Sequence, residues 1–358
     1  MAKFALRLEA RPTPSRLMSW LSPVLAVLLT VLCGALLFVA LGHDPLAGLA
    51  VFFVEPLRDA HGWSELGLKV APLLLIAVGL AICFRANIYN IGAEGQLTLG
   101  AICGGAAALY LDDGVGGATV IGVSLLAGMA GGMAWAGLVA WLRDRYNASE
   151  ILVSLMLVYI AQLLLSYLVY GVLRDPEGFN FPQSKLLSDG LLLPMVISDT
   201  RLHVGIIFAL LASLGGWVYL SRSIAGFRLR VGGMAPAAAR YAGFSSRKTL
   251  WSSLLICGAL SGLAGACEVL GPMGQLTPTV SPGYGFAAII VAFVGRLHPV
   301  GVLFSSFVMA LFYIGGELAQ SRLGLPSAIT GVFQGILLFA LLACDVLIQY
   351  KLRWRKHG

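Results

Sequence analysis

The sequence predicts an all-α protein that crosses a membrane about ten times. Of its 358 residues, 58% are hydrophobic and only 11% are charged, and the mean hydropathy is +0.87. Soluble domains carry charge on about a quarter of their residues, so a soluble globular fold is excluded. The basic residues also gather in alternate loops, as they do on the cytoplasmic side of membrane proteins.

About ten apolar runs follow one another along the chain. The first, at 20–41, is long enough to span a bilayer, and we expect a retained helix rather than a signal peptide. The others lie near 66–84, 97–111, 117–142, 150–172, 204–221, 249–270, 286–295, 300–318 and 326–348. Because 286–295 is too short to cross a hydrocarbon core of about 30 Å, whether it is a full span stays open.

The distribution of charge predicts the topology. Arg143, Arg145, the loop 222–248 and the basic tail after Gln349 fall on one side, which makes both termini cytoplasmic. Acidic residues, among them Asp112 and Asp113, fall on the other side. We expect one transmembrane domain, 1–358, with a cytoplasmic loop at 222–248 and an external segment at 173–203 that suits an external partner.

Several chemistries are not expected. The six cysteines lie in apolar runs without a CxxC pair, and the five histidines are scattered, so neither disulfides nor a metal site is predicted. The basic residues are not interleaved with stacking aromatic residues, which argues against nucleic acid. The chain has no Gly-Lys-Ser/Thr, so it should not bind ATP through a P-loop.

The loop 222–248 carries six basic residues and no acidic one. Within it, Met234 to Tyr241 predicts a short helix, because Pro236 suits a first helical turn, alanines favour helix, and Gly243 follows where a helix would stop. Charge alone would make this loop no more than a topology signal.

A second polar stretch, NIGAEGQ at 90–96, stands between two apolar runs. If Asn90 caps a helix that starts at Ile91, Glu94 falls in its first turns, where the helix dipole favours a carboxylate. The alternative is a plain reversal loop with an exposed Glu94. Polar groups near the membrane interior favour a functional role.

Two further local patterns lead to expectations. Glycines four residues apart, at 100/104, 128/132 and 258/262, predict close helix packing. Asn147-Ala148-Ser149 matches a glycosylation sequon, but its predicted cytoplasmic placement favours Asn147 as the cap of the next helix, with Glu150 three residues on.

The loop resembles the coupling loop of ABC importer permeases of the simple-sugar and nucleoside family. The matching residues are Arg230, Gly232 or Gly233, Ala237, Ala238 and Gly243, and Phe244 stands where the family usually has Ile. NIGAEGQ closely resembles a signature of the same family. A third stretch, with GYGF at 283–286 and a G-R-x-x-P turn at 295–299, is similar to the family's glycine-rich segment, although VAFVG stands where the family has VALLG. The resemblance covers about residues 66–345.

This resemblance implies a cobalamin-permease-like (type II) importer fold and a permease subunit in the bacterial inner membrane that is not itself an enzyme. It implies no cofactor on this chain, ATP and Mg used by a partner ATPase, a second permease, an external substrate-binding protein, surrounding lipid, and a nucleoside or simple sugar as substrate. The residues it assigns to ATPase coupling are Arg228, Arg230, Gly232, Met234, Pro236, Ala237, Ala238, Arg240, Tyr241 and Gly243. Those it places on the translocation pathway are Asn87, Asn90, Gly92, Glu94, Gln96, Glu268 and Tyr284.

Three alternatives remain. An ion-coupled transporter would use Lys69, Glu268, Glu317 and Asp345 as relay groups. A branched-chain amino acid permease of the same superfamily normally lacks NIGAEGQ, and a structural membrane protein explains neither motif. The sequence leaves open whether the substrate is a nucleoside or a sugar, and whether the second permease is identical or homologous.

Overall fold

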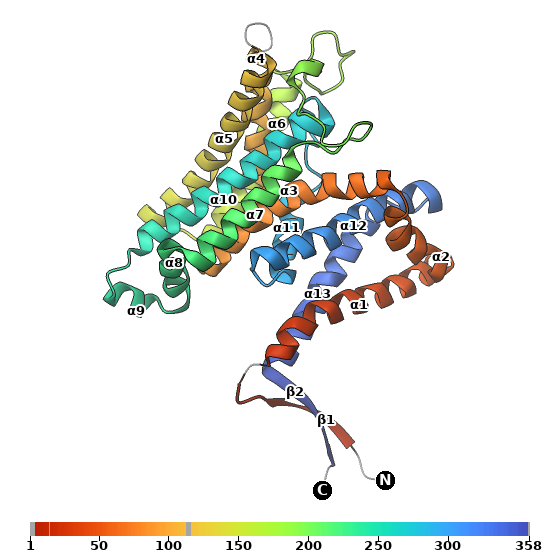
Figure 1. Cartoon of the computed structure of the whole chain (residues 1–358), viewed down its shortest axis with the longest axis vertical. Helices are drawn as coiled ribbons and strands as arrows, with labels where there is room; N and C mark the ends of the chain where they lie inside the picture. Colours follow the sequence, from red (N-terminus) through yellow and green to blue (C-terminus); the bar gives the residue numbers. More distant parts are fainter. Residues whose placement is uncertain (1–3, 14, 112–115, 357–358) are drawn as a thin grey trace. The chain divides into compact units, whose positions relative to one another are not determined.

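The computed structural model describes residues 4–13, 15–111 and 116–356, and Asp112 and Asp113 therefore lie outside the described residues. Within these residues, the named secondary-structure elements are helices or helical turns apart from β1 (Phe4–Ala10) and β2 (Tyr350–Lys356), which pair antiparallel (Figure 1). It divides into two compact units, residues 1–62 with 311–358, and residues 63–310. The boundaries fall within α3 (Ala60–Arg85) and α12 (Pro299–Leu323).

The first unit joins the two ends of the chain. Helices α1 (Arg16–Ala40) and α13 (Ile329–Gln349) pack together, and the strands continue from them. Short α2 (Pro45–Leu49) and the π and 3-10 turns Ala50–Val54 and Glu55–Leu57 follow α1. Phe52 stacks on Phe333 with ring centroids 4.3 Å apart, and Phe38 and Phe312 pack around them. Aromatic packing of this kind gives the unit its core.

The second unit packs other helices around two buried ones. In α3, 89% of the most apolar window is buried, and α4 (Ala93–Leu111) is mostly buried too. In α6 (Glu150–Tyr170) only 22% is buried, and apolar side chains such as Leu163 project outward. Apolar side chains that face outward on a long helix suit contact with lipid. The unit also contains α5 (Gly117–Tyr146), α7 (Gly205–Arg222), α10 (Ser246–Glu268) with the π turn Val269–Met273, and α11 (Tyr284–Val294).

The predicted glycine packing is confirmed between α4, α5 and α10. A Cβ on Gly100 would lie 2.3 Å from the Cα of Gly262, and one on Gly132 would lie 2.2 Å from the carbonyl oxygen of Gly258. Real Cβ atoms do not approach this closely. Only glycine therefore lets these three helix backbones touch.

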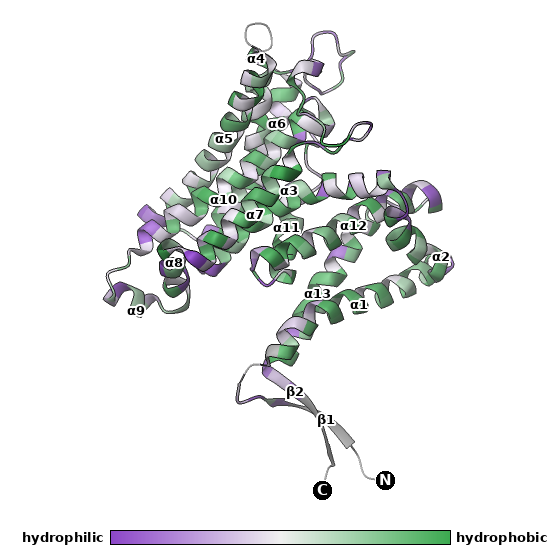
Figure 2. Ribbon diagram, in the orientation of Figure 1, coloured by the Kyte–Doolittle hydropathy of each residue, from purple (hydrophilic) through white to green (hydrophobic). Residues whose placement is uncertain are grey.

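Among the described residues, eight helices are long and apolar enough to cross a membrane. Each predicted apolar run corresponds to a helix; the two runs outside those eight are α4 and the 11-residue α11. A span count of ten and cytoplasmic termini stay predictions. In the second unit, Figure 2 shows largely hydrophobic helices, with hydrophilic residues gathered around α8 (Ile224–Met234) and α9 (Pro236–Tyr241).

Within the second unit, backbone hydrogen bonds join the segment 173–203 to the residues that follow α10. Leu187 and Leu193 donate to the carbonyl oxygens of Gly274 and Leu270 at 2.8 and 2.7 Å, and the segment contains a 3-10 turn at Asp189–Leu191. His203, at its end, is buried; its Nδ1 accepts from the Gly205 amide at 3.0 Å. Burial lowers the pKa of His203 to about 4.

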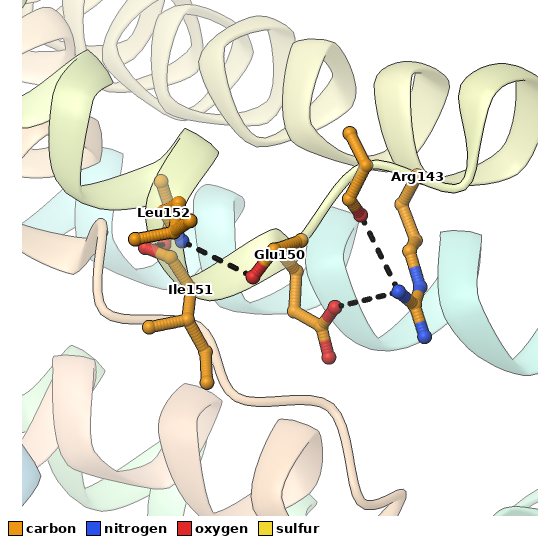
Figure 3. A network of polar contacts seen from close by, with 7 residues as sticks. Arg143, Glu150, Ile151 and Leu152 are labelled. Atoms are coloured by element: carbon orange, nitrogen blue, oxygen red, sulfur yellow. Dashed lines mark hydrogen bonds and ion pairs between the residues drawn. The ribbon is translucent and has the colours of Figure 1, made fainter.

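The prediction that Asn147 caps α6 is wrong. Asn147 ends α5 in the left-handed conformation, at φ +50°, and the Oγ of Ser149 instead accepts from the Leu152 amide at 3.5 Å (Figure 3). Glu150 turns back toward Arg143, with the carboxylate 3.3 Å from the guanidinium. Asparagine tolerates positive φ better than serine does, so it takes the turn and leaves the cap to Ser149.

Candidate functional site

The loop 222–248 folds into two short helices, and we call this region the α8–α9 loop. Ser223 caps α8, its Oγ accepting from the Gly226 amide at 2.9 Å. Pro236 begins α9, and Gly243 follows it at φ +76°. The predicted helix start at Met234 is wrong by two residues, because Met234 ends α8 and Ala235 breaks the helix at ψ 73°.

The α8–α9 loop exposes large apolar side chains at one end of the second unit. Tyr241 is 97% exposed and Met234 80%, while Ala237 and Ala238 are exposed and Ala239 is buried. A buried alanine anchors α9, and the outer face stays available. Exposed apolar residues grouped within one short segment are typical of a surface that contacts another protein.

A cavity of about 380 Å³ lies beside α9 and the first turn of α10. Asn87, at φ +58°, lines it together with Arg240, Asp144 and Arg247. The Asp144 carboxylate accepts from the Arg247 guanidinium at 2.7 Å and from the Trp251 indole at 3.1 Å, which ties the end of α5 to the start of α10. Asn87, predicted on the pathway, thus lies beside the predicted coupling helix.

The NIGAEGQ residues form a buried polar network. Asn90 and Gln96 are fully buried; the Oδ1 of Asn90 accepts from the Gly92 amide at 3.0 Å and from the Nε2 of Gln96 at 3.3 Å. Its Nδ2 lies 3.2 Å from the Sγ of Cys257. The helix begins at Ala93 rather than at Ile91, because its first backbone hydrogen bond is the one that the Gln96 amide donates to the Gly92 carbonyl oxygen at 3.1 Å.

Glu94 links this network to the GYGF segment. It lies in the first turn of α4, as predicted, and its relative accessibility is 2%, so the alternative of a plain reversal loop with an exposed Glu94 is wrong. Its Oε2 accepts from the Gly285 amide at 2.6 Å, at the start of α11. A Cβ on Gly285 would lie 2.3 Å from the Glu94 nitrogen, so glycine is required for this approach. We call Asn90, Glu94, Gln96 and Gly285 the buried junction.

Glu268 and Tyr284 lie together elsewhere in the second unit. Both line a cavity of about 350 Å³, together with Lys69, Arg201, the end of the π turn and the non-helical segment that follows it up to Pro282. The residues of the buried junction line neither cavity. The pathway residues predicted from the sequence therefore fall into three places: Asn87 beside α9, the NIGAEGQ group inside the junction, and Glu268 with Tyr284 in this second cavity.

Sequence reasoning missed Arg201, Gln275 and Thr277 as lining residues of the second cavity, and named Lys69 only as a relay group. The signal was the proline- and glycine-rich stretch after α10, because non-helical backbone at membrane depth needs protein or a polar cavity around it. Among the described residues, no group of three His, Cys, Asp or Glu side chains could hold a metal ion.

Comparisons with known proteins agree with this architecture. The family described as branched-chain amino acid transport system, permease component, matches residues 64–342. A glucose ABC transporter permease of Haloferax volcanii is 32% identical over 97% of this chain and 93% of its own length. A guanosine ABC transporter permease of Bacillus subtilis is 31% identical over 90% of this chain and 93% of its own, and a nucleoside ABC transporter permease of Lactococcus lactis is 26% identical over 89% of each.

A solved structure shares the fold. A metal-chelate type ABC transporter in an inward-facing conformation aligns with a TM-score of 0.50 at 18% identity, over 92% of this chain and 99% of that chain. This likeness supports the type II importer fold. The chain therefore belongs to the family of branched-chain amino acid transport system permease components, as a multi-pass subunit of the cell membrane whose family works with a separate ATPase and a substrate-binding protein.

Proposed function

We propose that this chain is the permease of an ATP-driven importer that carries a nucleoside or a simple sugar. The observation that carries the proposal is the α8–α9 loop. At one end of the second unit it presents the short helix α9 with exposed Tyr241, and exposed Met234 at the end of α8 just before it. Such a surface suits a soluble partner better than lipid, because Arg228 and Arg240 on the same loop are exposed and charged.

In this proposal the α8–α9 loop docks on the ATPase. Small side chains at Ala237, Ala238 and Gly243 permit close approach, and the arginines supply charge around them. ATP and Mg are bound by the ATPase, and this chain binds no cofactor. The Asp144 contacts with Arg247 and Trp251 then pass movement of α9 on to α5 and α10. A second permease, identical or homologous, completes the complex.

The buried junction is proposed to join the moving parts of the pathway. Because the Glu94 carboxylate holds the first turn of α11, a shift of α4 carries α11 with it. Asn87, Asn90, Gly92 and Gln96 lie along the same connection, between the α8–α9 loop and α4. These residues act on the pathway by setting helix positions, whereas Glu268 and Tyr284 line a cavity directly.

The substrate class rests on the relatives. The relatives of this chain include permeases of transporters for glucose, guanosine and nucleosides. Glucose and guanosine are both neutral compounds with hydroxyl groups on adjacent carbons. We propose the same class for this chain, in preference to the branched-chain amino acids that the family description names.

The test is uptake by the complete complex in lipid vesicles with the binding protein outside. ATP-dependent entry of radiolabelled guanosine or glucose is expected, with no competition from leucine. Uptake that follows an ion gradient without ATP would contradict the proposal and favour an ion-coupled transporter, and competition by leucine alone would favour an amino acid permease.

A further inference from the structure

The second cavity combines charged and uncharged polar side chains from separate parts of the chain. Its volume of about 350 Å³ is within the range of about 300 to 1,000 Å³ that ligand pockets occupy. Lys69 comes from α3, Arg201 from the segment 173–203, and Glu268 from the end of α10. The remaining polar lining comes from the non-helical stretch that follows α10, namely Gln275, Thr277 and Thr279.

The charges around this cavity are balanced. Glu268 is buried, and both Lys69 and Arg201 lie near enough to act on its carboxylate. Arg201 is also held by Glu65, with its Nε 3.0 Å from a carboxylate oxygen. With all four groups ionised, two cations and two carboxylates leave no net charge, so an ion of either sign would meet an unfavourable neighbour. A neutral ligand suits the cavity best.

The nearby helix N-terminus gives an anion no additional attraction. The first turn of α11 begins at Tyr284, which lines the cavity together with Pro282. Exposed N-terminal amides would favour a negatively charged group. The Glu94 carboxylate already accepts from the Gly285 amide at 2.6 Å, so this chain supplies its own anion there.

The polar atoms in the cavity have complementary capacities. An ionised carboxylate only accepts hydrogen bonds and an ammonium only donates, whereas a hydroxyl does both. A hydroxyl placed between Glu268 and Lys69 can therefore satisfy both. The Oγ1 of Thr277 is buried and has no hydrogen-bond partner among the described residues, so it can bond a second hydroxyl. The Lys69 ammonium is held 5.9 Å from the centre of the Tyr284 ring, which positions it.

We propose that this cavity binds the transported compound through a vicinal diol, with Glu268 accepting from the hydroxyls, Lys69 donating to one of them, and Thr277 bonding the other. This inference rests on the proposed function, because it assigns a subsite for the neutral substrate class. The diol could belong to the ribose of a nucleoside or to the ring of a hexose.

The experiment compares each compound with an analogue that lacks the diol. It uses the complete complex in lipid vesicles, with ATP on the side of the membrane that carries the ATPase. One arm measures guanosine against 2′,3′-dideoxyguanosine, and the other measures methyl glucoside against its 3-deoxy analogue. The readout is the uptake rate of the compound that carries the diol divided by the uptake rate of its analogue. The binding protein is the same throughout, so a change of this ratio between variants reports on the permease.

In Glu268→Gln the ratio is expected to fall about tenfold, because a hydrogen bond to a charged group is replaced by one to a neutral group. Thr277→Val, which keeps the side-chain shape, should lower it about threefold. Arg145→Gln, exposed at the end of α5 and outside the cavity lining, should leave it unchanged. Size-exclusion chromatography identifies a variant that does not fold.

A fall confined to the guanosine arm identifies ribose as the source of the diol, and one confined to the glucoside arm identifies a hexose. Two results together overturn this proposal and leave the proposed function standing. Thr277→Val keeps the wild-type ratio, and Glu268→Gln either keeps it as well or does not fold. Absence of ATP-dependent uptake of both compounds by the wild-type complex overturns the proposed substrate class, and the diol subsite with it.

Discussion

The buried junction and the α8–α9 loop are the two motif-bearing regions of the second unit, and they differ in how their residues are used. In the junction, Asn90, Glu94 and Gln96 are almost completely buried and bond to one another or to the backbone. In the loop, Met234 is 80% exposed and Tyr241 97%. The junction completes its contacts within the chain, whereas the exposed face of the loop is the surface proposed to dock on the ATPase.

This difference separates two kinds of effect. A change in the junction removes contacts that the folded chain already contains, so it should lower stability before it alters any partner. A change on the exposed face of α9 removes nothing from the chain alone, so it should alter only the complex. Measurements of stability and of coupling on the same variants test the distinction.

The largest effect is expected for Ala238→Asp. Ala238 is exposed in this chain, so the variant should fold as the wild type does. In a docked complex the new carboxylate would be an unpaired charge in a buried contact, which costs about 2 to 5 kcal/mol of affinity for the ATPase. The measurement is ATPase binding and substrate-stimulated hydrolysis in lipid. Ser246→Asp, outside α9, is the control and should couple normally; equal coupling in both variants would leave the loop as a topology signal.

Gly285→Ala should act on stability instead. The added Cβ would lie 2.3 Å from the Glu94 nitrogen and 2.5 Å from its Cα, and backbone cannot move aside as a flexible side chain can. We expect a loss of about 3 kcal/mol in unfolding free energy, measured by thermal unfolding in detergent. Gly215→Ala in α7 is the matched control, because nothing lies within 4 Å of its Cβ position. A Gly285→Ala protein as stable as that control would rule out the tight junction.

Glu94→Ala tests the same junction from its other side. Loss of the carboxylate leaves the Gly285 amide without its acceptor in a buried place, at a cost of about 2 kcal/mol. Uptake should fall as well, since α11 is no longer held to α4. Thermal unfolding and vesicle uptake measure the two effects, and Glu177→Ala serves as an exposed control. Unchanged stability together with wild-type uptake would contradict both roles.

His203 extends the comparison to a buried group with a pH-dependent charge. Its pKa of about 4 in the folded chain lies below the ordinary 6.5, so folding favours the neutral ring. This contribution is complete above pH 6.5 and is lost as the pH falls toward 4. At pH 6 the wild type should have lost roughly 1 kcal/mol relative to pH 8. His203→Gln should lack this loss, and parallel stability curves for the two proteins between pH 8 and 5 would show that His203 is not the titrating group.

The sequence alone predicted most helices closely, because apolar periodicity and length need only local information. The run predicted at 150–172 is the helix Glu150–Tyr170, and that at 204–221 is Gly205–Arg222. Local capping chemistry was less predictable. Asn147 and Ser149 both suit a cap, and only the left-handed backbone at Asn147 decides between them.

The predicted site residues show the limit of the same information. NIGAEGQ and GYGF were both recognised as motifs, yet their contact through Glu94 and Gly285 joins residues 191 positions apart in the chain. Lys69 and Glu268 were named together only as scattered relay groups, and Arg201 was not named at all. A cavity made by three distant segments has no local pattern from which it could be read.

By itself, the sequence determined that this protein is a helical membrane protein, where its helices lie, and which family it resembles, because composition, hydrophobic runs and short motifs are properties of neighbouring residues. The tertiary structure decided what the motifs do to one another. It buried Glu94 against a helix start, left Tyr241 exposed, and brought Lys69, Arg201 and Glu268 around one cavity. Burial and charge balance depend on residues that are distant in the chain, and packing alone brings them together.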